Sequence, residues 1–145
     1  MSARSDIVKA LVTAFKQIDG SSPYLSNIFG NCVPKHVFWD EVSDFPYMCV
    51  VDGSEQREYL PGGFKWGYLG ISIKIYVKDE ESSLKLQDLM SDVEKVLDNS
   101  TRLVYGTGEG QQTAEIRVTS LVTDEGLLAP YGIGEININV QYQVV

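Results

Sequence analysis

The chain has 145 residues, of which 43% are hydrophobic and 22% are charged, as in an ordinary globular domain. Its net charge of −8 argues against tight binding to nucleic-acid phosphates, which needs clustered Lys and Arg side chains. It shows no apolar run of membrane-spanning length and no export signal, and its two cysteines are too few for a disulfide framework. We therefore expect a single domain over residues 1–145, with free thiols, made in a reducing cytoplasm.

Two amphipathic helices are expected. Residues 5–18 place apolar side chains at helical spacing, with Ser5 as the N-cap and Gly20 as the stop signal. The second helix follows an acidic, hydroxyl-rich start at residues 79–83 and runs to about Asp98. Each helix has one apolar stripe and one polar face, so each should cover a core rather than stand in solvent.

The strand signals are strongest over residues 66–78, where apolar side chains alternate with polar ones. Further strands are expected over residues 47–51, 113–122 and 134–144, and the first of these should turn at Asp52-Gly53. Residues 54–65 should form either an extended hairpin arm or a mobile loop. Residues 21–44 should be irregular, with a short strand or helical turn at 24–29 and a short strand at 36–39.

The order of these elements is helix, strands, helix, strands. Two amphipathic helices can cover one face of a mainly antiparallel or mixed sheet. The sequence therefore predicts an α+β fold, arranged as a two-layer sandwich.

Motifs for chemistry are weak throughout the chain. His36 is the only histidine, and no set of side chains has recognised metal-ligand spacing. The glycine-rich loop at residues 106–110 lacks the Lys-Ser/Thr ending of a phosphate-binding loop. The carboxylates of residues 79–80 and 124–125 are explained by a helix start and a turn. We therefore predict no catalytic residue, no metal and no cofactor.

Two features favour binding. Tyr59 and Phe64 flank the turn at residues 61–63, where aromatic side chains act either as interface anchors or as cover for the core. The polar face of the last strand is a row of uncharged amides: Asn137, Asn139, Gln141 and Gln143. Such a row suits pairing with a second sheet or lining a wet lumen, although an ordinary solvated face is an equal alternative.

The layout also resembles a known family. Phe45-Pro46 opens a strand, a long alternating strand leads into an acidic-started helix, and Thr123-Asp-Glu-Gly126 with Pro130, Gly132 and Glu135 precedes the final strand. In this layout, which spans most of the chain, the protein resembles the tail terminator, or tail completion, proteins of long-tailed bacteriophages.

This resemblance implies a structural virion protein at the head–tail junction, present in the host cytoplasm during assembly. Such proteins form a ring, expected to be a hexamer, that caps the tail tube, ends its growth and provides the docking surface for the head connector. The implied partners are copies of the chain, the tail tube protein and a head-connector or neck protein. DNA would pass through the lumen without specific binding, and the family brings no catalytic motif.

Subunit contacts are expected at exposed strand edges, the arm at residues 54–65, the loop at 105–111 and the link at 127–132. The candidate interface residues are Tyr59, Leu60, Phe64, Tyr105, Glu109, Asp124, Glu125, Leu127, Leu128 and Tyr131. Two alternatives stay open at this point. One is another head–tail joining or neck adaptor protein, and the other is a small cytosolic ligand-binding or enzymatic α+β domain.

Overall fold

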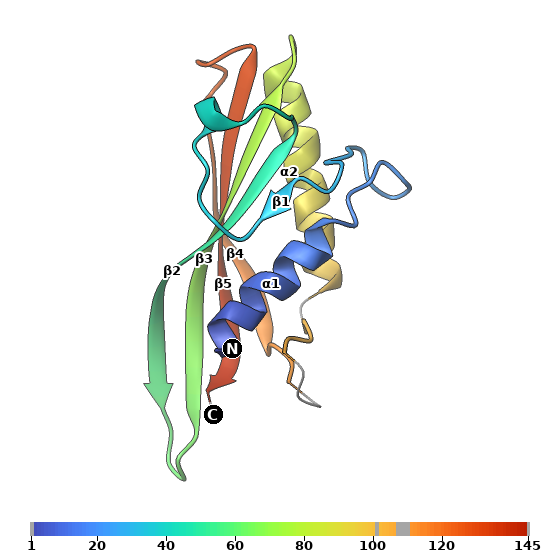
Figure 1. Ribbon diagram of the computed structural model, residues 1–145. Helices are drawn as coiled ribbons and strands as arrows, with labels where there is room; N and C mark the ends of the chain where they lie inside the picture. The colour runs from blue at the N-terminus through green and yellow to red at the C-terminus, as the bar shows by residue number, and fades with distance from the viewer. Residues whose placement is uncertain (1, 101, 107–110, 145) are drawn as a thin grey trace.

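The computed structural model describes residues 2–100, 102–106 and 111–144, which form one sheet with two long helices packed on it (Figure 1). In chain order the elements are α1 (Ala3–Phe15), β1 (Cys32–Val33), a turn of 3-10 helix (Trp39–Glu41), β2 (Tyr47–Tyr59), β3 (Lys65–Lys78), α2 (Ser82–Asn99), β4 (Glu115–Thr123) and β5 (Tyr131–Val144). The long strand, the second helix and the last strand lie close to their predicted positions.

The sheet has five strands in the order β1-β2-β3-β5-β4. The two-residue strand β1 runs parallel to β2, and every other neighbouring pair is antiparallel. The sheet is therefore mixed, and the predicted α+β class is confirmed.

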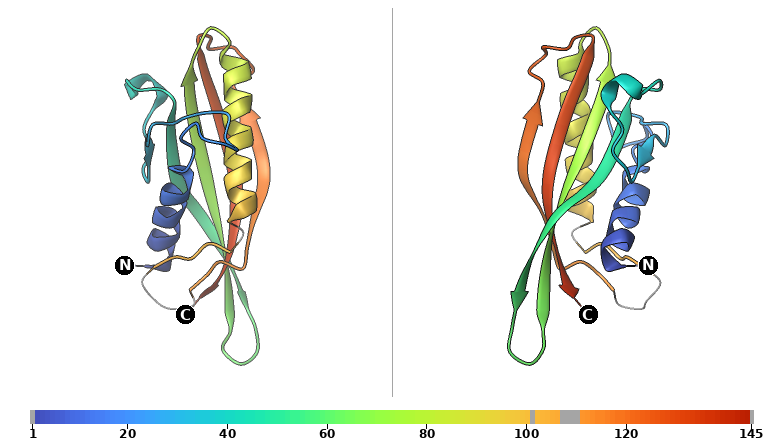
Figure 2. Two further views of the ribbon diagram at one scale, coloured as in Figure 1. Left: turned by 90° about the vertical axis from the view of Figure 1, so that its right-hand side faces the viewer. Right: turned by 60° about the vertical axis from the view of Figure 1, so that its left-hand side comes forward.

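Both helices lie on the same side of the sheet (Figure 2). Helix α2 packs over β3 and β5, whereas α1 packs over β1 and β2. The alternating apolar side chains of β3 and β5, such as Ile73 and Ile136, are fully buried under these helices. This burial follows from the twofold side-chain period of a strand, which puts one apolar face toward the helices and leaves the other open.

The first helix begins earlier than predicted. Its N-cap is Ser2, whose hydroxyl accepts a hydrogen bond from the Ser5 backbone N–H at 3.2 Å, so Ser5 lies inside the helix. The α-helix also ends at Phe15 rather than at residue 18, because the next turn tightens: the Ile18 N–H donates to the Phe15 carbonyl at 3.1 Å. Ser2 and Ser5 are equally suitable N-cap residues by type, so the sequence alone does not fix the first turn of the helix.

The predicted turn at Asp52-Gly53 is wrong, because β2 continues to Tyr59. A bulge between Asp52 and Glu55 interrupts the register, and the strand then pairs with β3 as far as Tyr59 opposite Lys65. Gly70 lies across from the bulge, where a Cβ atom would come within 3.1 Å of the Ser54 carbonyl oxygen. The glycine signal therefore marks a bulge rather than a turn, and residues 54–65 form the hairpin arm.

In the described structure, the short strand or helical turn expected at residues 24–29 and the short strand expected at residues 36–39 are also absent. Residues 24–29 form a loop, and the described structure has its short strand at Cys32–Val33 and its 3-10 turn at Trp39–Glu41. Residues 34–46 instead cover the upper part of the open sheet face, where the Tyr76 hydroxyl donates to the Val37 carbonyl at 2.7 Å. Tertiary contact, not local pattern, fixes this segment, since the Trp39 ring packs on the Tyr131 ring at 5.2 Å.

Candidate interaction surfaces

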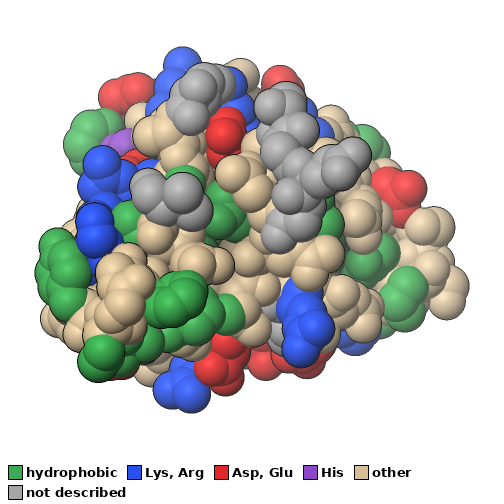
Figure 3. All heavy atoms as spheres, turned by 90° about the horizontal axis from the view of Figure 1, so that it is seen from below, with side chains coloured by type: hydrophobic (Ala, Val, Ile, Leu, Met, Phe, Trp, Pro, Cys, Tyr) green, Lys and Arg blue, Asp and Glu red, His purple; other side chains and the backbone are tan. Residues whose placement is uncertain are grey.

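The hairpin arm projects beyond the body of the molecule (Figure 1). Its turn is closed by the Leu60 N–H, which donates to the Phe64 carbonyl at 2.8 Å. Around this turn Tyr59, Phe64 and Leu60 are 69%, 57% and 38% exposed. Viewed from the arm end, hydrophobic side chains gather between charged ones on the surface (Figure 3). Three large apolar side chains displayed together on a projecting segment are typical of a binding surface.

The base of the arm is fixed by a cluster that the sequence did not reveal. The Glu55 carboxylate is almost buried, accepts a hydrogen bond from the Tyr142 hydroxyl, and pairs with the Arg57 guanidinium at 2.7 Å. The Tyr142 ring lies over Gly67, where an added Cβ atom would come within 2.7 Å of the ring. Burial first, and the bond to Glu55 second, raise the pKa of Tyr142 to about 12. These contacts fix the direction of the arm at its base, where its first residues pair across the two strands.

The open face of the sheet carries the row of amides in an orderly hydrogen-bonded arrangement. The Ser72 hydroxyl donates to the Asn137 side-chain oxygen at 2.8 Å, and the Asn137 amide donates to the Ser120 hydroxyl at 2.9 Å. Farther along this row, beside Asn139 and Gln141, the face is hollowed over about 420 Å³. The face is therefore polar, and uncharged groups dominate its centre.

Two ion pairs lie on this open face. Lys74 lies 3.7 Å from Glu135 on the neighbouring strand, and Arg117 lies 2.9 Å from Glu115 on β4. These partly exposed pairs contribute little to stability. These two pairs add no net charge to the face, although the whole chain carries −8.

The link between β4 and β5 is a rigid turn with an apolar tip. The Asp124 carboxylate accepts hydrogen bonds from the Leu128 N–H at 3.1 Å and the Ile133 N–H at 3.3 Å. Leu127 is 83% exposed, Leu128 is 37% exposed, and Glu125 is exposed beside them. Asp124 thus orders the turn, while the two leucines and Glu125 are available for contact.

Three other candidate residues lie in different settings. Tyr131 is partly covered by the Trp39 and Phe45 rings, at centroid distances of 5.2 and 5.7 Å. Tyr105 is only 5% exposed, because its ring packs edge-on against Tyr142, so it supports the core instead of offering a surface contact. Glu109 lies outside the described residues.

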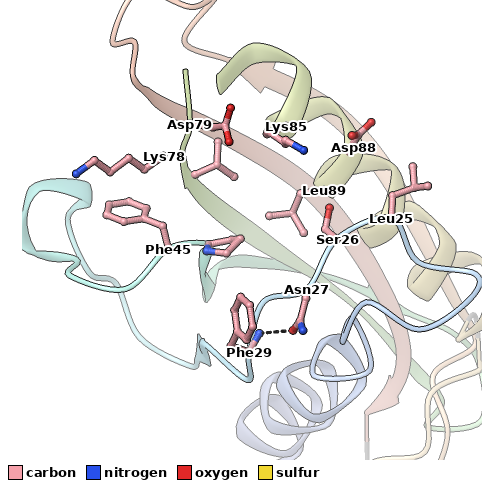
Figure 4. A pocket seen from close by; sticks show the side chains of 12 residues that line it. Leu25, Ser26, Asn27, Phe29, Phe45, Lys78, Asp79, Lys85, Asp88 and Leu89 are labelled. Atoms are coloured by element: carbon pink, nitrogen blue, oxygen red, sulfur yellow. Dashed lines mark hydrogen bonds between the residues drawn. The ribbon is translucent and has the colours of Figure 1, made fainter. Parts of the chain in front are cut away.

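A groove of about 310 Å³ opens between α2, the loop at residues 25–29 and the start of β2 (Figure 4). Leu25 and Phe29 are 63% and 71% exposed at its edge. Phe29 has a positive φ of 54°, which is uncommon for a bulky residue, and its N–H donates to the Asn27 side chain at 2.8 Å. The groove has apolar walls, with lysines and aspartates at its mouth.

A buried carboxylate holds the loop of this groove in place. Asp92 on α2 is fully buried and accepts hydrogen bonds from the Leu25 N–H at 2.9 Å and the Ser26 N–H at 2.7 Å. Lys95 lies 3.7 Å from Asp92 and also donates to the Pro23 carbonyl at 3.1 Å. This anchor is not predictable from the sequence, because the polar spacing of Asp92 in an amphipathic helix is typical of a solvent-facing residue.

The described residues contain no group of three or more His, Cys, Asp or Glu side chains placed to hold a metal ion. Both cysteines are free and buried, and desolvation raises the pKa of Cys32 to about 12, so its reactive thiolate is disfavoured. Within the same described ranges, no helix has the length and apolar character required to cross a membrane. The surfaces described above are therefore the features of this structure that suit binding.

Comparison with known proteins agrees with this picture. The family model for the bacteriophage tail tube terminator protein matches residues 1–145. The tail tube terminator protein p142 of Escherichia phage T5 is 37% identical over 153 residues, covering 99% of this chain and 95% of that protein. A chain from the solved virion of a native gene transfer agent particle shares the fold with a TM-score of 0.62 at 11% identity, covering 95% of this chain and 98% of that one. The chain therefore belongs to the bacteriophage tail tube terminator family, a family of structural virion proteins rather than enzymes.

Proposed function

We propose that this protein forms a ring, most simply a hexamer, on the last ring of the tail tube, where it ends tube growth and presents a docking surface to the head connector. The observation that carries the proposal is the family match over residues 1–145, together with the 37% identity to a named tail tube terminator. The chain acts as one domain in this role.

The shape of the molecule supports an assembly role. Two preordered segments project apolar side chains into solvent: the arm tip with Phe64 and the turn tip with Leu127. They lie at opposite ends of the long strands, since β3 begins next to the arm turn and ends beside the β4–β5 turn. A ring of such subunits would present one apolar segment toward each axial neighbour, the tube on one side and the connector on the other.

The open sheet face supports a role as the channel wall. Paired charges and uncharged amides give it few sites that could hold a phosphate backbone, because phosphate binding relies on unpaired Lys and Arg. DNA would slide past such a wall without specific binding.

Assembly in the absence of this chain tests the proposal. Tail tubes made without it should be irregular and overlong and should fail to join heads, and adding the purified chain should restore joining. Tails isolated before they meet a head should carry the chain at one end. Tubes of normal length without the chain, or a chain found only on heads, would instead identify a different neck protein.

The arm is tested by deleting residues 56–63. We expect the shortened chain to fold but to lose either ring formation or tail completion, because the deletion removes the exposed Tyr59 and Leu60 while the buried core is unchanged. Native mass measured at several concentrations separates the two losses. A shortened chain that still forms rings and completes tails would show that the arm is not a contact.

A further inference from the structure

The two edges of the sheet differ in a way that bears on how copies of the chain meet. Among the described residues, β4 pairs with β5 on one side only, so its outer edge is free along Glu115–Thr123. Strand β2 is covered by β1 only at Met48 and Cys49, so its outer edge is free from Val50 to Tyr59. Free edges of this length expose unpaired backbone N–H and carbonyl groups and are natural sites for strand addition.

The direction of these two strands fits cyclic symmetry. Strands β2, β3, β5 and β4 alternate in direction across the sheet, so β4 runs antiparallel to β2. In a ring every subunit has the same orientation relative to the axis. The β4 edge of one subunit would therefore meet the β2 edge of the next in antiparallel fashion, with the helix-covered faces on the same side.

Two apolar side chains of β4 are largely uncovered by the described part of the chain. Val118 and Leu121 point to the helix-covered face, because they pair with the buried Ile138 and Ile136. They are nevertheless 41% and 48% exposed, since α2 packs mainly over β3 and β5. Exposed apolar side chains on an edge strand are an aggregation hazard unless a partner covers them.

The opposite edge carries a complementary hollow. It has a volume of about 210 Å³, lies on the helix-covered face between α1 and β2, and is lined by Ser5, Val8, Lys9, Pro34 and Asp52. Val118 and Asp52 occupy the same cross-strand row of the sheet, because Val118 pairs with Ile138, Ile138 with Ile71, and Ile71 with Asp52. Val118 at one edge and the hollow at the other edge therefore lie at the same position along the strand direction.

The helices on the two sides of such a junction have opposite charge. Helix α1 with its C-cap carries three cations, Arg4, Lys9 and Lys16, against one carboxylate. Helix α2 carries four carboxylates against two lysines. In the helix layer, α2 of one subunit and α1 of the next would flank the junction. Their opposite charges favour contact between the β4 edge of one subunit and the β2 edge of the next.

From these observations we infer that the partner of the β4 edge is the β2 edge of a second copy of this chain, with Val118 or Leu121 seated in the hollow beside α1. The inference rests on the proposed ring and specifies its subunit contact. The sheet would then continue from subunit to subunit, and no free edge of useful length would remain.

Covalent capture tests the contact. The double variant Asp52→Cys/Val118→Cys, treated with a short bismaleimide, should give a ladder of covalent multimers on a denaturing gel, because both positions are at the junction. The native cysteines are 3% and 0% exposed, so they do not compete. The matched control is Asp52→Cys/Leu84→Cys, since Leu84 is 62% exposed on α2, which packs over the inner strands β3 and β5. The control should give no more product than the single-cysteine variants.

Edge blocking gives a second readout. Val118→Lys with Leu121→Lys should convert the ring to monomer in native mass while leaving the denaturation midpoint of the monomer unchanged, whereas Leu84→Lys should leave the ring intact. Rings that form without a ladder, or that survive both lysines, overturn the inference and leave the proposed function standing. A wild-type chain that remains a monomer in solution and on tail tubes overturns the proposed ring and the edge contact together.

Discussion

Replacement of Asp92 offers the sharpest test of how the loop at residues 21–29 is held. The carboxylate is fully buried and receives three hydrogen-bond contacts from the Leu25 and Ser26 N–H groups, at 2.9, 3.1 and 2.7 Å. In the Asp92→Ala variant both donors lose their acceptor. Hydrogen bonds to charged groups contribute about 1.5–3 kcal/mol each and are not additive, so we expect a loss of about 3–4 kcal/mol in the free energy of unfolding.

Urea denaturation followed by fluorescence measures this loss, and for a chain of this size it corresponds to a fall in Tm of about 10 °C. Asp92→Asn keeps the shape and one acceptor oxygen, so it should lose about half as much stability. The matched control is Asp98→Asn on the same helix, where the side chain is exposed and the change should stay within about 0.5 kcal/mol. If Asp92→Ala matches this control, the carboxylate does not anchor the loop.

Other consequences can be measured on the same protein. Gly67→Ala should displace the Tyr142 ring, which would lie 2.7 Å from the new Cβ atom, and cost about 1–3 kcal/mol; an unchanged denaturation midpoint would contradict this packing. Stability should fall as the pH rises above about 9, because burial raises the pKa values of Cys32, Tyr76 and Tyr142 to about 12 from ordinary values of 9.0 and 10.0. As the pH rises, the unfolded chain loses these protons before the folded chain does. The contribution of the three protonated groups to the free energy of unfolding is therefore full below pH 9 and is lost as the pH approaches 12. A melting temperature that stays constant from pH 8 to pH 11 would refute the raised pKa values. Phe64→Ser should leave the free energy of unfolding within about 0.5 kcal/mol, because the side chain is 57% exposed, yet it should reduce tail completion in a reconstitution assay; a destabilised monomer would place Phe64 in the fold instead.

The elements with a long periodic pattern could be predicted from the amino-acid sequence alone. The alternation in β3 and β5 placed Ile73 and Ile136 in the core, and the apolar stripe of α2 placed that helix on the sheet. These predictions were reliable because a long element repeats its signal many times. The family resemblance could be recognised for a related reason. It rests on the order and length of the elements, which the periodic patterns predict.

The tertiary structure decided what depends on partners distant in sequence. Asp92 reads as a solvent-facing acid until the loop at residues 21–29 covers it, and Glu55 reads as part of a polar arm until Tyr142 reaches it across β3. The glycine at residue 53 is compatible with a turn or a bulge, and pairing with β3 selects the bulge. Likewise, only the order of strands shows that Val118 and Asp52 lie in one row at opposite edges. Each of these outcomes is set by contacts between segments far apart in the chain, and local propensity carries no information about them.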